Sequence, residues 1–134
     1  METVRKHSRK RDAILQCLRE TDVHPSAEWV YQKLKPQIPD LSLGTVYRNL
    51  SLFKAGGQIA SLGTVQGLER FDGNTEPHAH FICRRCGRVL DLAGVELPES
   101  VLRQAGDLSG HRAESCRLTF SGCCRFCEET EKIF

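Results

Sequence analysis

Four cysteines in two Cys-x-x-Cys pairs constrain this chain more than any other feature of its sequence. Cys83 and Cys86 form the first pair, and Cys124 and Cys127 form the second. A Cys-x-x-Cys turn directs both sulfur atoms toward one point, and two such turns supply the four thiolates that tetrahedral zinc prefers. The 37 residues between the pairs exceed the usual zinc-finger gap, so we expect separate strand ends that folding brings together. The sequence therefore predicts a structural zinc site made of four cysteines.

The expected cellular compartment favours some roles for these cysteines over others. The chain holds seven cysteines in 134 residues, with no apolar run long enough to cross a membrane and no secretory signal at its N-terminus. We therefore expect a cytoplasmic protein without a membrane partner, in which cysteines act as metal ligands or redox groups before disulfides. A reversible redox pair and a rubredoxin-like iron site remain alternatives to zinc. Cys17, Cys116 and Cys123 are not needed to complete four ligands.

The first half of the chain has the apolar periodicity of helices. Residues 8–20 carry one apolar stripe at helical spacing. A second helix is expected after Ser26 and a third after Ser42, because serine is a favoured N-cap. The third helix keeps four apolar side chains on one face, Leu43, Val46, Leu50 and Phe53. The glycine pair Gly56-Gly57 is expected to end it.

The segments around the third helix indicate a DNA-binding fold. Two short helices joined by a short turn, the second with hydroxyls and an arginine outside its apolar face, predict a helix-turn-helix. Residues 58–73 then alternate in short segments around glycines, as in a two-stranded wing. Strands around the first Cys-x-x-Cys and before the second, with a helix near residues 99–107 between them, complete the second half.

Together these patterns predict an α+β fold with two domains. Residues 1–73 form a winged helix-turn-helix, residues 74–77 a hinge, and residues 78–134 a small α/β dimerisation domain with the four-cysteine zinc site. The charge is divided in the same way. Residues 1–60 hold ten Lys/Arg and six Asp/Glu, whereas residues 61–134 hold nine and eleven. A basic N-terminal half is typical of a nucleic-acid-facing domain, although a solvated basic helix face explains the charge equally well.

A second set of metal ligands differs in chemistry from the cysteines. On a strand, residues i and i+2 point to the same face, so His78 and His80 can converge on one ion. Asp72 and Asp91 lie nearby in the sequence. Nitrogen combined with carboxylate oxygen suits Fe(II), Mn(II) or Zn(II) rather than metals that prefer thiolates. The stretch HAHFICRRCGRVLDL is therefore expected to contribute to two sites, one of sulfur only and one of nitrogen and oxygen.

Five stretches together resemble one known family over nearly the whole chain. They are HPSAEWVYQKLK, PDLSLGTVYRNLSLF, ERFDG, HAHFICRRCGRVLDL and GCCRFC. The sequence is similar to the ferric uptake regulator (Fur) superfamily of metal-dependent dimeric repressors. The resemblance implies a regulatory site with five ligands: His24, Asp72, His78, His80 and, after the second strand, Asp91. Aspartate at the last position resembles the peroxide-responsive PerR branch, because iron-sensing members generally have glutamate there.

The resemblance also implies the partners. A homodimer would place two recognition helices in the major grooves of a double-stranded operator with an inverted repeat. Thr45 and Tyr47 are expected to contact bases or thymine methyl groups, although ordinary packing also explains Tyr47. Arg48, Lys54 and the basic run that ends at Arg11 are expected to contact phosphates. The family run Thr-Pro-Gln-Arg matches this chain only at that arginine.

The expected function is transcriptional repression that hydrogen peroxide relieves. Fe(II) in the five-ligand site would promote oxidation of His24 or His78, after which metal and DNA are released, whereas Mn(II) would repress without this chemistry. The alternative is a Fur-like or Zur-like repressor that senses iron, zinc or manganese availability; Cys116 as a ligand would fit a zinc sensor. A metalloenzyme is disfavoured, because no residue stands out as a dedicated acid, base or nucleophile. A zinc-ribbon module would leave the winged helix unexplained.

Overall fold

A computed structural model describes residues 2–76, 78–96, 98–114 and 116–133 of the chain. The chain forms two compact units, Met1–Thr75 and Glu76–Phe134. The division falls within the segment expected to be a hinge, of which Pro77 lies outside the described residues. Among the described residues, no helix is long and apolar enough to span a membrane. The fold class expected from the sequence is confirmed, and each unit is described by itself below.

Three helices begin the first unit, and their ends follow from local sequence. Helix α1 spans Glu2–Glu20, α2 spans Ala27–Leu34 and α3 spans Leu43–Ala55. The side chain of Ser26 accepts a hydrogen bond from the backbone N–H of Trp29 at 3.2 Å, and Ser42 accepts one from Thr45 at 3.1 Å. Each serine thereby satisfies a backbone donor that a helix start leaves without a partner. Both predicted N-caps are confirmed, and Gly56 is the C-cap of α3.

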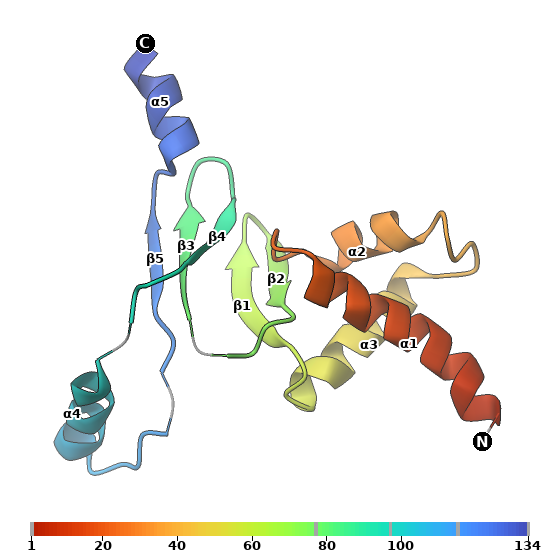
Figure 1. Cartoon of the computed structure of the whole chain (residues 1–134), viewed down its shortest axis with the longest axis horizontal. Coiled ribbons are helices and arrows are strands. Elements are labelled where there is room, and N and C mark those ends of the chain that lie inside the picture. The colour runs from red at the N-terminus through yellow and green to blue at the C-terminus, as the bar shows by residue number, and fades with distance from the viewer. Residues whose placement is uncertain (1, 77, 97, 115, 134) are drawn as a thin grey trace. The chain divides into compact units, whose positions relative to one another are not determined.

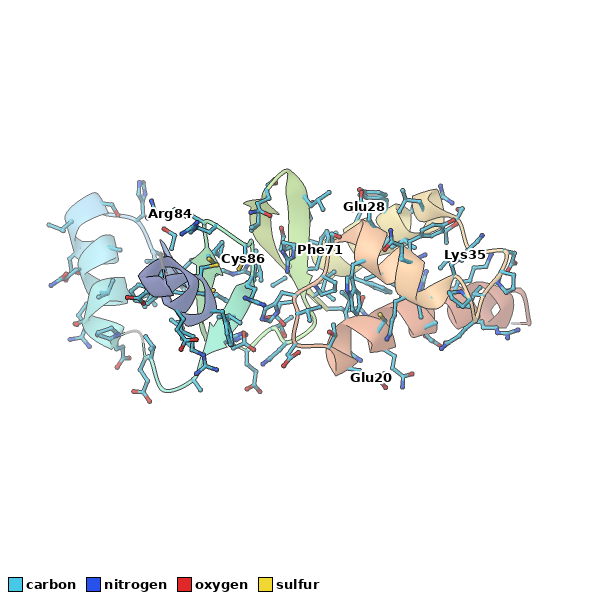
Figure 2. All side chains as sticks on the ribbon, turned by 90° about the horizontal axis from the view of Figure 1, so that it is seen from above. Glu20, Glu28, Lys35, Phe71, Arg84 and Cys86 are labelled. Atoms are coloured by element: carbon cyan, nitrogen blue, oxygen red, sulfur yellow. The ribbon has the colours of Figure 1, made fainter. Side chains whose placement is uncertain are left out.

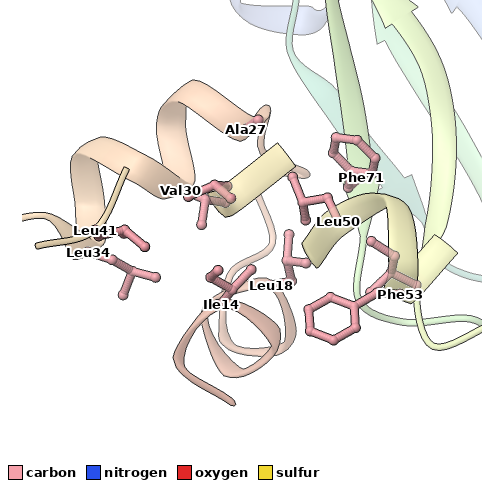
Figure 3. Close-up of a cluster of buried hydrophobic side chains, with 11 residues drawn as sticks. Ile14, Leu18, Ala27, Val30, Leu34, Leu41, Leu50, Phe53 and Phe71 are labelled. Carbon is pink, nitrogen blue, oxygen red and sulfur yellow. The ribbon is translucent and has the colours of Figure 1, made fainter. Parts of the chain in front are cut away.

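The core of the first unit is built from the apolar stripes of its helices (Figure 3). It consists of Ile14, Leu18, Ala27, Val30, Leu34, Leu41, Val46, Leu50, Phe53, Ile59 and Phe71. The predicted stripe of α3 is confirmed at Val46, Leu50 and Phe53, all of them buried. Phe71 enters this core from the strand pair that follows α3, so the wing is packed against the helices.

The wing is an antiparallel hairpin of β1, Ala60–Val65, and β2, Leu68–Asp72. Its tight turn consists of Gln66 and Gly67, which have φ values of 51° and 84°. Two successive positive φ values are what a type I′ hairpin turn requires. The predicted wing is confirmed, and its second strand ends at Asp72.

The second unit has a three-stranded sheet with β3 at its centre (Figure 1). Its strands are β3, Ala79–Cys83; β4, Val89–Leu92; and β5, Thr119–Gly122. Strand β3 pairs antiparallel with β4 and parallel with β5. Helix α4, Glu99–Ser109, connects β4 to β5 and confirms the predicted helix. It forms part of the long connection that the parallel neighbours β3 and β5 require.

Two features of the second unit differ from the sequence prediction. Asp91 lies within β4 rather than after it, because the strand continues to Leu92 and pairs with β3 along that length. A last helix, α5, Arg125–Ile133, was not predicted. Its sequence is dominated by charged residues and carries no long apolar stripe. It starts where the second Cys-x-x-Cys turn leaves the sheet, with the N–H of Glu128 bonded to the carbonyl of Cys124 at 2.9 Å.

Candidate functional site

The four cysteines of the two Cys-x-x-Cys pairs converge in the second unit. The Sγ atoms of Cys83 and Cys127 lie 3.8 Å apart, as do those of Cys86 and Cys124, and all four lie within 4.8 Å of one another. A tetrahedron with Zn–S bonds of about 2.3 Å has edges of about 3.8 Å. The spacing therefore fits a zinc site with four cysteine ligands. It is too long for disulfides, and all seven cysteines are free thiols.

Strand pairing brings the two turns together. Cys83 is the last residue of β3 and pairs with Gly122, the last residue of β5. The N–H of Arg84 extends this ladder by donating to the Gly122 carbonyl at 2.8 Å. Because β3 and β5 run parallel, both strands end at the same edge of the sheet, and a Cys-x-x-Cys turn follows there in each case. Figure 2 labels Arg84 and Cys86 at the first of these turns.

Backbone N–H groups favour the thiolate form of Cys83, which is the form that binds a cation. The N–H groups of Cys86 and Cys124 donate to the sulfur of Cys83 at 3.5 and 3.3 Å and lower the pKa of its thiol to about 5. Burial raises the pKa of the Cys127 thiol to about 12. Four thiolates at this distance repel one another, so the cluster retains protons until a cation is present. Zinc binding is therefore coupled to proton release.

Arg88 is a residue of this cluster that the sequence motif did not reveal. Its Nη1 lies 3.7 Å from the sulfur of Cys86 and 3.8 Å from that of Cys124. Its guanidinium lies 4.7 Å from the centre of the Phe126 ring at the start of α5. Four thiolates around a divalent ion give a complex with a net negative charge, which the positive charge of Arg88 partly offsets.

In the first unit, the structure places His24 beside Asp72. His24 Nδ1 lies 3.6 Å from Asp72 Oδ2, and both side chains are buried. Asp72 is held by the N–H of Asn74, which donates to its other oxygen at 2.9 Å. His24 follows α1 and Asp72 ends β2, so the pair joins segments 48 positions apart in the sequence. A buried nitrogen and a buried carboxylate oxygen at this distance are two donor atoms of the kind that Fe(II), Mn(II) or Zn(II) accepts.

Gly73 explains why Asp72 can approach the helices. A Cβ atom at this position would lie 2.8 Å from the backbone carbon and oxygen of Leu18. The end of β2 therefore packs directly on the last turn of α1, where no side chain fits. This close approach fixes the backbone next to Asp72.

In the second unit, two histidines and an aspartate meet across the strand pair. His78 Nε2 and His80 Nε2 lie 3.1 and 3.3 Å from the same oxygen of Asp91, Oδ1. His80 and Asp91 are direct partners in the β3–β4 register, and the two imidazole rings are 4.2 Å apart. The convergence expected for His78 and His80 is therefore present, although His78 lies one residue before β3.

The hydrogen bond of His78 favours the tautomer that a metal requires. Its Nδ1 lies 2.6 Å from the carbonyl oxygen of Glu76. A carbonyl can only accept, so Nδ1 carries the hydrogen and a neutral ring directs the lone pair of Nε2 toward Asp91. Metal-binding histidines usually donate their other N–H in this way. The donor set of this unit fits a divalent cation.

The residues expected to contact DNA gather on α1 and α3. Arg11, Thr45 and Arg48 line one groove of about 880 Å³, together with Arg9 and Lys10. Arg48 Nη2 donates to the Thr45 hydroxyl at 3.1 Å, which joins these two side chains on the exposed face of α3. The groove holds four cationic side chains and one carboxylate, Asp40, which forms an ion pair with Lys10 at 3.1 Å, so its net charge is positive. Such a surface suits a phosphate backbone.

Two further residues of this set have partners within the unit. Tyr47 is 44% exposed, and its hydroxyl donates to a carboxylate oxygen of Glu28 on α2. Lys54 Nζ lies 3.1 Å from Glu69 Oε2 on the wing. The ion pair holds the charge of Lys54 between α3 and β2.

Comparison with known proteins shows the family. The ferric uptake regulator family model matches residues 2–121. The peroxide-responsive repressor PerR of Staphylococcus aureus (strain USA300) is 35% identical over 120 residues, covering 90% of this chain and 80% of that protein. The Campylobacter jejuni peroxide stress regulator is similar in fold, with a TM-score of 0.78, 23% identity and coverage of 94% of each chain. The Francisella tularensis ferric uptake regulator with iron has a TM-score of 0.72 and 27% identity, over 88% of this chain and 90% of that one.

The winged helix, the four-cysteine cluster and the nitrogen–oxygen donor sets define a metal-responsive DNA-binding regulator. The chain belongs to the ferric uptake regulator family. Members of this family are transcriptional regulators, not enzymes, and they act as metal-responsive dimeric repressors.

Proposed function

We propose that this protein is a homodimeric repressor that senses hydrogen peroxide through a metal ion bound by His24, Asp72, His78, His80 and Asp91. The observation that carries the proposal is the composition of the two donor sets, one in each unit. Each combines histidine nitrogen with an aspartate oxygen, at 3.6 Å in the first unit and at 3.1 and 3.3 Å in the second. The 35% identity with PerR supports the same assignment.

We propose that each site binds a different metal. Zn(II) is held by Cys83, Cys86, Cys124 and Cys127 and stabilises the second unit. Fe(II) or Mn(II) is held by the five nitrogen and oxygen ligands. When bound there, Fe(II) supplies the redox chemistry by which hydrogen peroxide oxidises a neighbouring imidazole. We assign that oxidation to His24 and secondarily to His78, and an oxidised ring is a poorer ligand.

Metal binding and DNA binding are coupled in this proposal. His24 and Asp72 belong to the unit with the recognition helix, whereas the other three ligands belong to the second unit. An ion bound by all five ties the two units together. If that state fits the operator better than the metal-free state, metal and operator raise each other's affinity by the same factor. Loss of one histidine ligand then releases DNA.

The second unit offers the surface for a homodimer. Among its described residues, the exposed large apolar side chains are Val95, Val101, Leu108, Phe120 and Phe126. Helix α4 has no buried residue, and the exposed fraction of Leu108 is 88%. Apolar side chains of this number on a unit of 59 residues favour a second copy of the chain as the partner. Dimerisation would place two copies of α3 on the half-sites of an inverted repeat.

Thr45 and Tyr47 are proposed to contact bases, and Arg11, Arg48 and Lys54 to contact phosphates. The shared groove of Arg11, Thr45 and Arg48 supports this assignment. Lys54 must exchange its ion pair with Glu69 for a phosphate.

Peptide mass spectrometry tests the proposal. The zinc-containing protein is loaded with Fe(II) or with Mn(II) and given a brief pulse of hydrogen peroxide. We expect one added oxygen on the peptide that holds His24 or His78 with Fe(II) only, together with loss of operator binding. Intact histidines with both metals would contradict peroxide sensing at this site.

The second candidate is a regulator of the same fold that responds to metal availability. The 27% identity with an iron-containing ferric uptake regulator favours it. In that case operator binding would follow the free concentration of iron, zinc or manganese, and peroxide would leave the ligand histidines unchanged.

A further inference from the structure

His24 has an unusual backbone conformation for a buried histidine. Its φ is 53°, in the left-handed region that residues with a Cβ rarely adopt, and its side chain is only 3% exposed. Such a conformation persists only where the surrounding structure fixes it, and such residues gather at functional sites. The contacts that fix His24 therefore bear on the function of its side chain.

Strand β2 supplies these contacts along three successive carbonyl groups. Arg70 Nη2 donates to the Val23 carbonyl at 2.7 Å, and Arg70 Nε donates to the carbonyl of His24. The N–H of the next residue, Phe71, donates to the Pro25 carbonyl at 3.0 Å. The segment before α2 is thus bonded to the strand that ends at Asp72.

The two carbonyls that Arg70 binds report directly on the conformation of His24. They belong to the peptide groups on either side of this residue, so its φ and ψ set their relative direction. In an extended residue the two carbonyls point to opposite sides, whereas in a helical conformation of either hand they point the same way. The planar guanidinium presents several N–H groups in a fixed fork and can bind both carbonyls only in the second case.

We propose that Arg70 is a positioning residue for the regulatory metal. It holds the backbone of His24 in the left-handed conformation and thereby directs the imidazole toward Asp72, two residues beyond Arg70 on the same strand. The inference rests on the proposed function, since it assigns His24 and Asp72 to that metal. Arg70 thus couples the direction of the His24 side chain, on the α1–α2 connection, to strand β2, which carries Asp72.

A double-mutant cycle in the full-length, zinc-containing protein tests this role. The variants are Arg70→Gln, His24→Ala and both together, with Arg19→Gln as a matched control at an exposed arginine of the same unit. Mn(II) affinity is measured by isothermal titration calorimetry, at a temperature where thermal unfolding shows every variant to be folded. We expect Arg70→Gln to weaken Mn(II) binding at least tenfold and Arg19→Gln to have no effect. In the His24→Ala background, Arg70→Gln should cause no further loss, because Arg70 acts through His24.

Hydrogen exchange of the metal-free protein gives a readout that does not depend on metal. Arg70→Gln should accelerate amide exchange at Phe71, whose N–H donates to the Pro25 carbonyl next to the released segment, while α3 keeps its protection. Arg70→Lys retains the charge but lacks the fork, and we expect its Mn(II) affinity to lie between those of Arg70→Gln and the unchanged protein. It replaces Arg70→Gln in the cycle if that variant does not fold.

The outcomes separate the two proposals. Unchanged Mn(II) affinity in Arg70→Gln, or losses that add in the double variant, would overturn the positioning role while leaving the metal site in place. Unchanged affinity in His24→Ala would overturn the proposed metal site and the role of Arg70 with it.

Discussion

The sulfur atoms of Cys86 and Cys124 lie 3.8 Å apart, although 38 positions separate them in the chain. Parallel pairing of β3 and β5 brings their turns to one edge of the sheet. The buried side chains of the second unit are few and include Cys83 and Cys124 themselves. A metal at this point would replace the apolar core that such a small unit lacks.

Cys124→Ser should therefore unfold the second unit and abolish the dimer. Structural zinc contributes on the order of 10 kcal/mol in small zinc domains, which exceeds the stability expected of this unit without metal. Zinc content by elemental analysis should fall from one per chain toward zero, and light scattering should show loss of the dimer. Cys123→Ser is the matched control, since Cys123 lies outside the cluster and should retain both. An intact dimer of Cys124→Ser would refute the structural role.

His24→Ala should weaken binding of the proposed regulatory metal without removing zinc. Loss of a partner that only orients a ligand costs about 10- to 100-fold in metal affinity, so loss of a ligand itself should cost more than about 100-fold. Calorimetric titration with Mn(II) and elemental analysis for zinc measure the two effects on one sample. The exposed His111, changed to alanine, is the control. Zinc lost together with Mn(II) would mean that the two sites are not independent.

Gly73→Ala should destabilise the first unit by about 1–3 kcal/mol, because its Cβ would overlap backbone atoms of Leu18 that cannot move alone. It should also weaken Mn(II) binding, since Asp72 is the adjacent residue. Urea unfolding followed by helical circular dichroism measures the stability. Gly44→Ala in α3 should have the opposite sign, up to about 1 kcal/mol stabilising, because its Cβ would meet only the flexible end of Arg48 at 3.3 Å and the Ser42 hydroxyl at 4.0 Å. Equal effects of the two substitutions would contradict the packing argument.

The environment of Glu69 should make the stability of the first unit depend on pH. The Ser61 hydroxyl at 2.6 Å and the Lys54 ammonium at 3.1 Å lower the pKa of its carboxyl below the usual 4.5. The ionised form therefore stabilises the folded unit fully above pH 4.5, and this contribution is lost as the pH falls through the lower folded pKa. Glu69→Gln should cost up to about 1 kcal/mol near pH 6 and progressively less below pH 4.5.

Urea unfolding of both proteins between pH 3 and pH 7 measures this difference. Ser61→Ala removes the main donor and should show part of the same effect. A stability difference that grows as the pH falls would contradict the assignment.

Arg48→Ala should weaken operator binding and its dependence on salt. Each phosphate contact adds about 0.9 to the slope of log affinity against log salt concentration, so one lost contact should lower the slope by about 1. Fluorescence anisotropy of labelled operator at several salt concentrations measures it in the Mn(II)-loaded dimer. Arg19→Ala, at the far end of α1, should leave the slope unchanged. A loss of affinity limited to particular base pairs would assign Arg48 to base recognition instead.

Several elements of this protein could be derived from the sequence because they depend on neighbouring residues. Ser26 and Ser42 begin helices since their hydroxyls reach backbone N–H groups three residues away. The period of the apolar residues marks the buried face of α3. Each Cys-x-x-Cys is likewise a local turn that directs two sulfur atoms to one point, so the composition of the four-cysteine cluster was visible before its position.

Other features depend on contacts between distant segments. Strand β4 runs past Asp91 because its ladder with β3 continues to Leu92, and α5, which contains Cys127, has few apolar residues that would predict it. The fork of Arg70 on the Val23 and His24 carbonyls joins residues 46 and 47 positions apart.

The sequence by itself determined which candidate donor atoms are present, since the identity of a donor atom is a property of the residue. Only the tertiary structure decided how these ligands are held. The direction of the His24 imidazole depends on a left-handed backbone that Arg70 and Phe71 maintain, and the approach of Asp72 depends on the absence of a side chain at Gly73. Hydrogen bonds and close packing between segments far apart in the chain have no period and no local motif, because the fold itself creates these contacts.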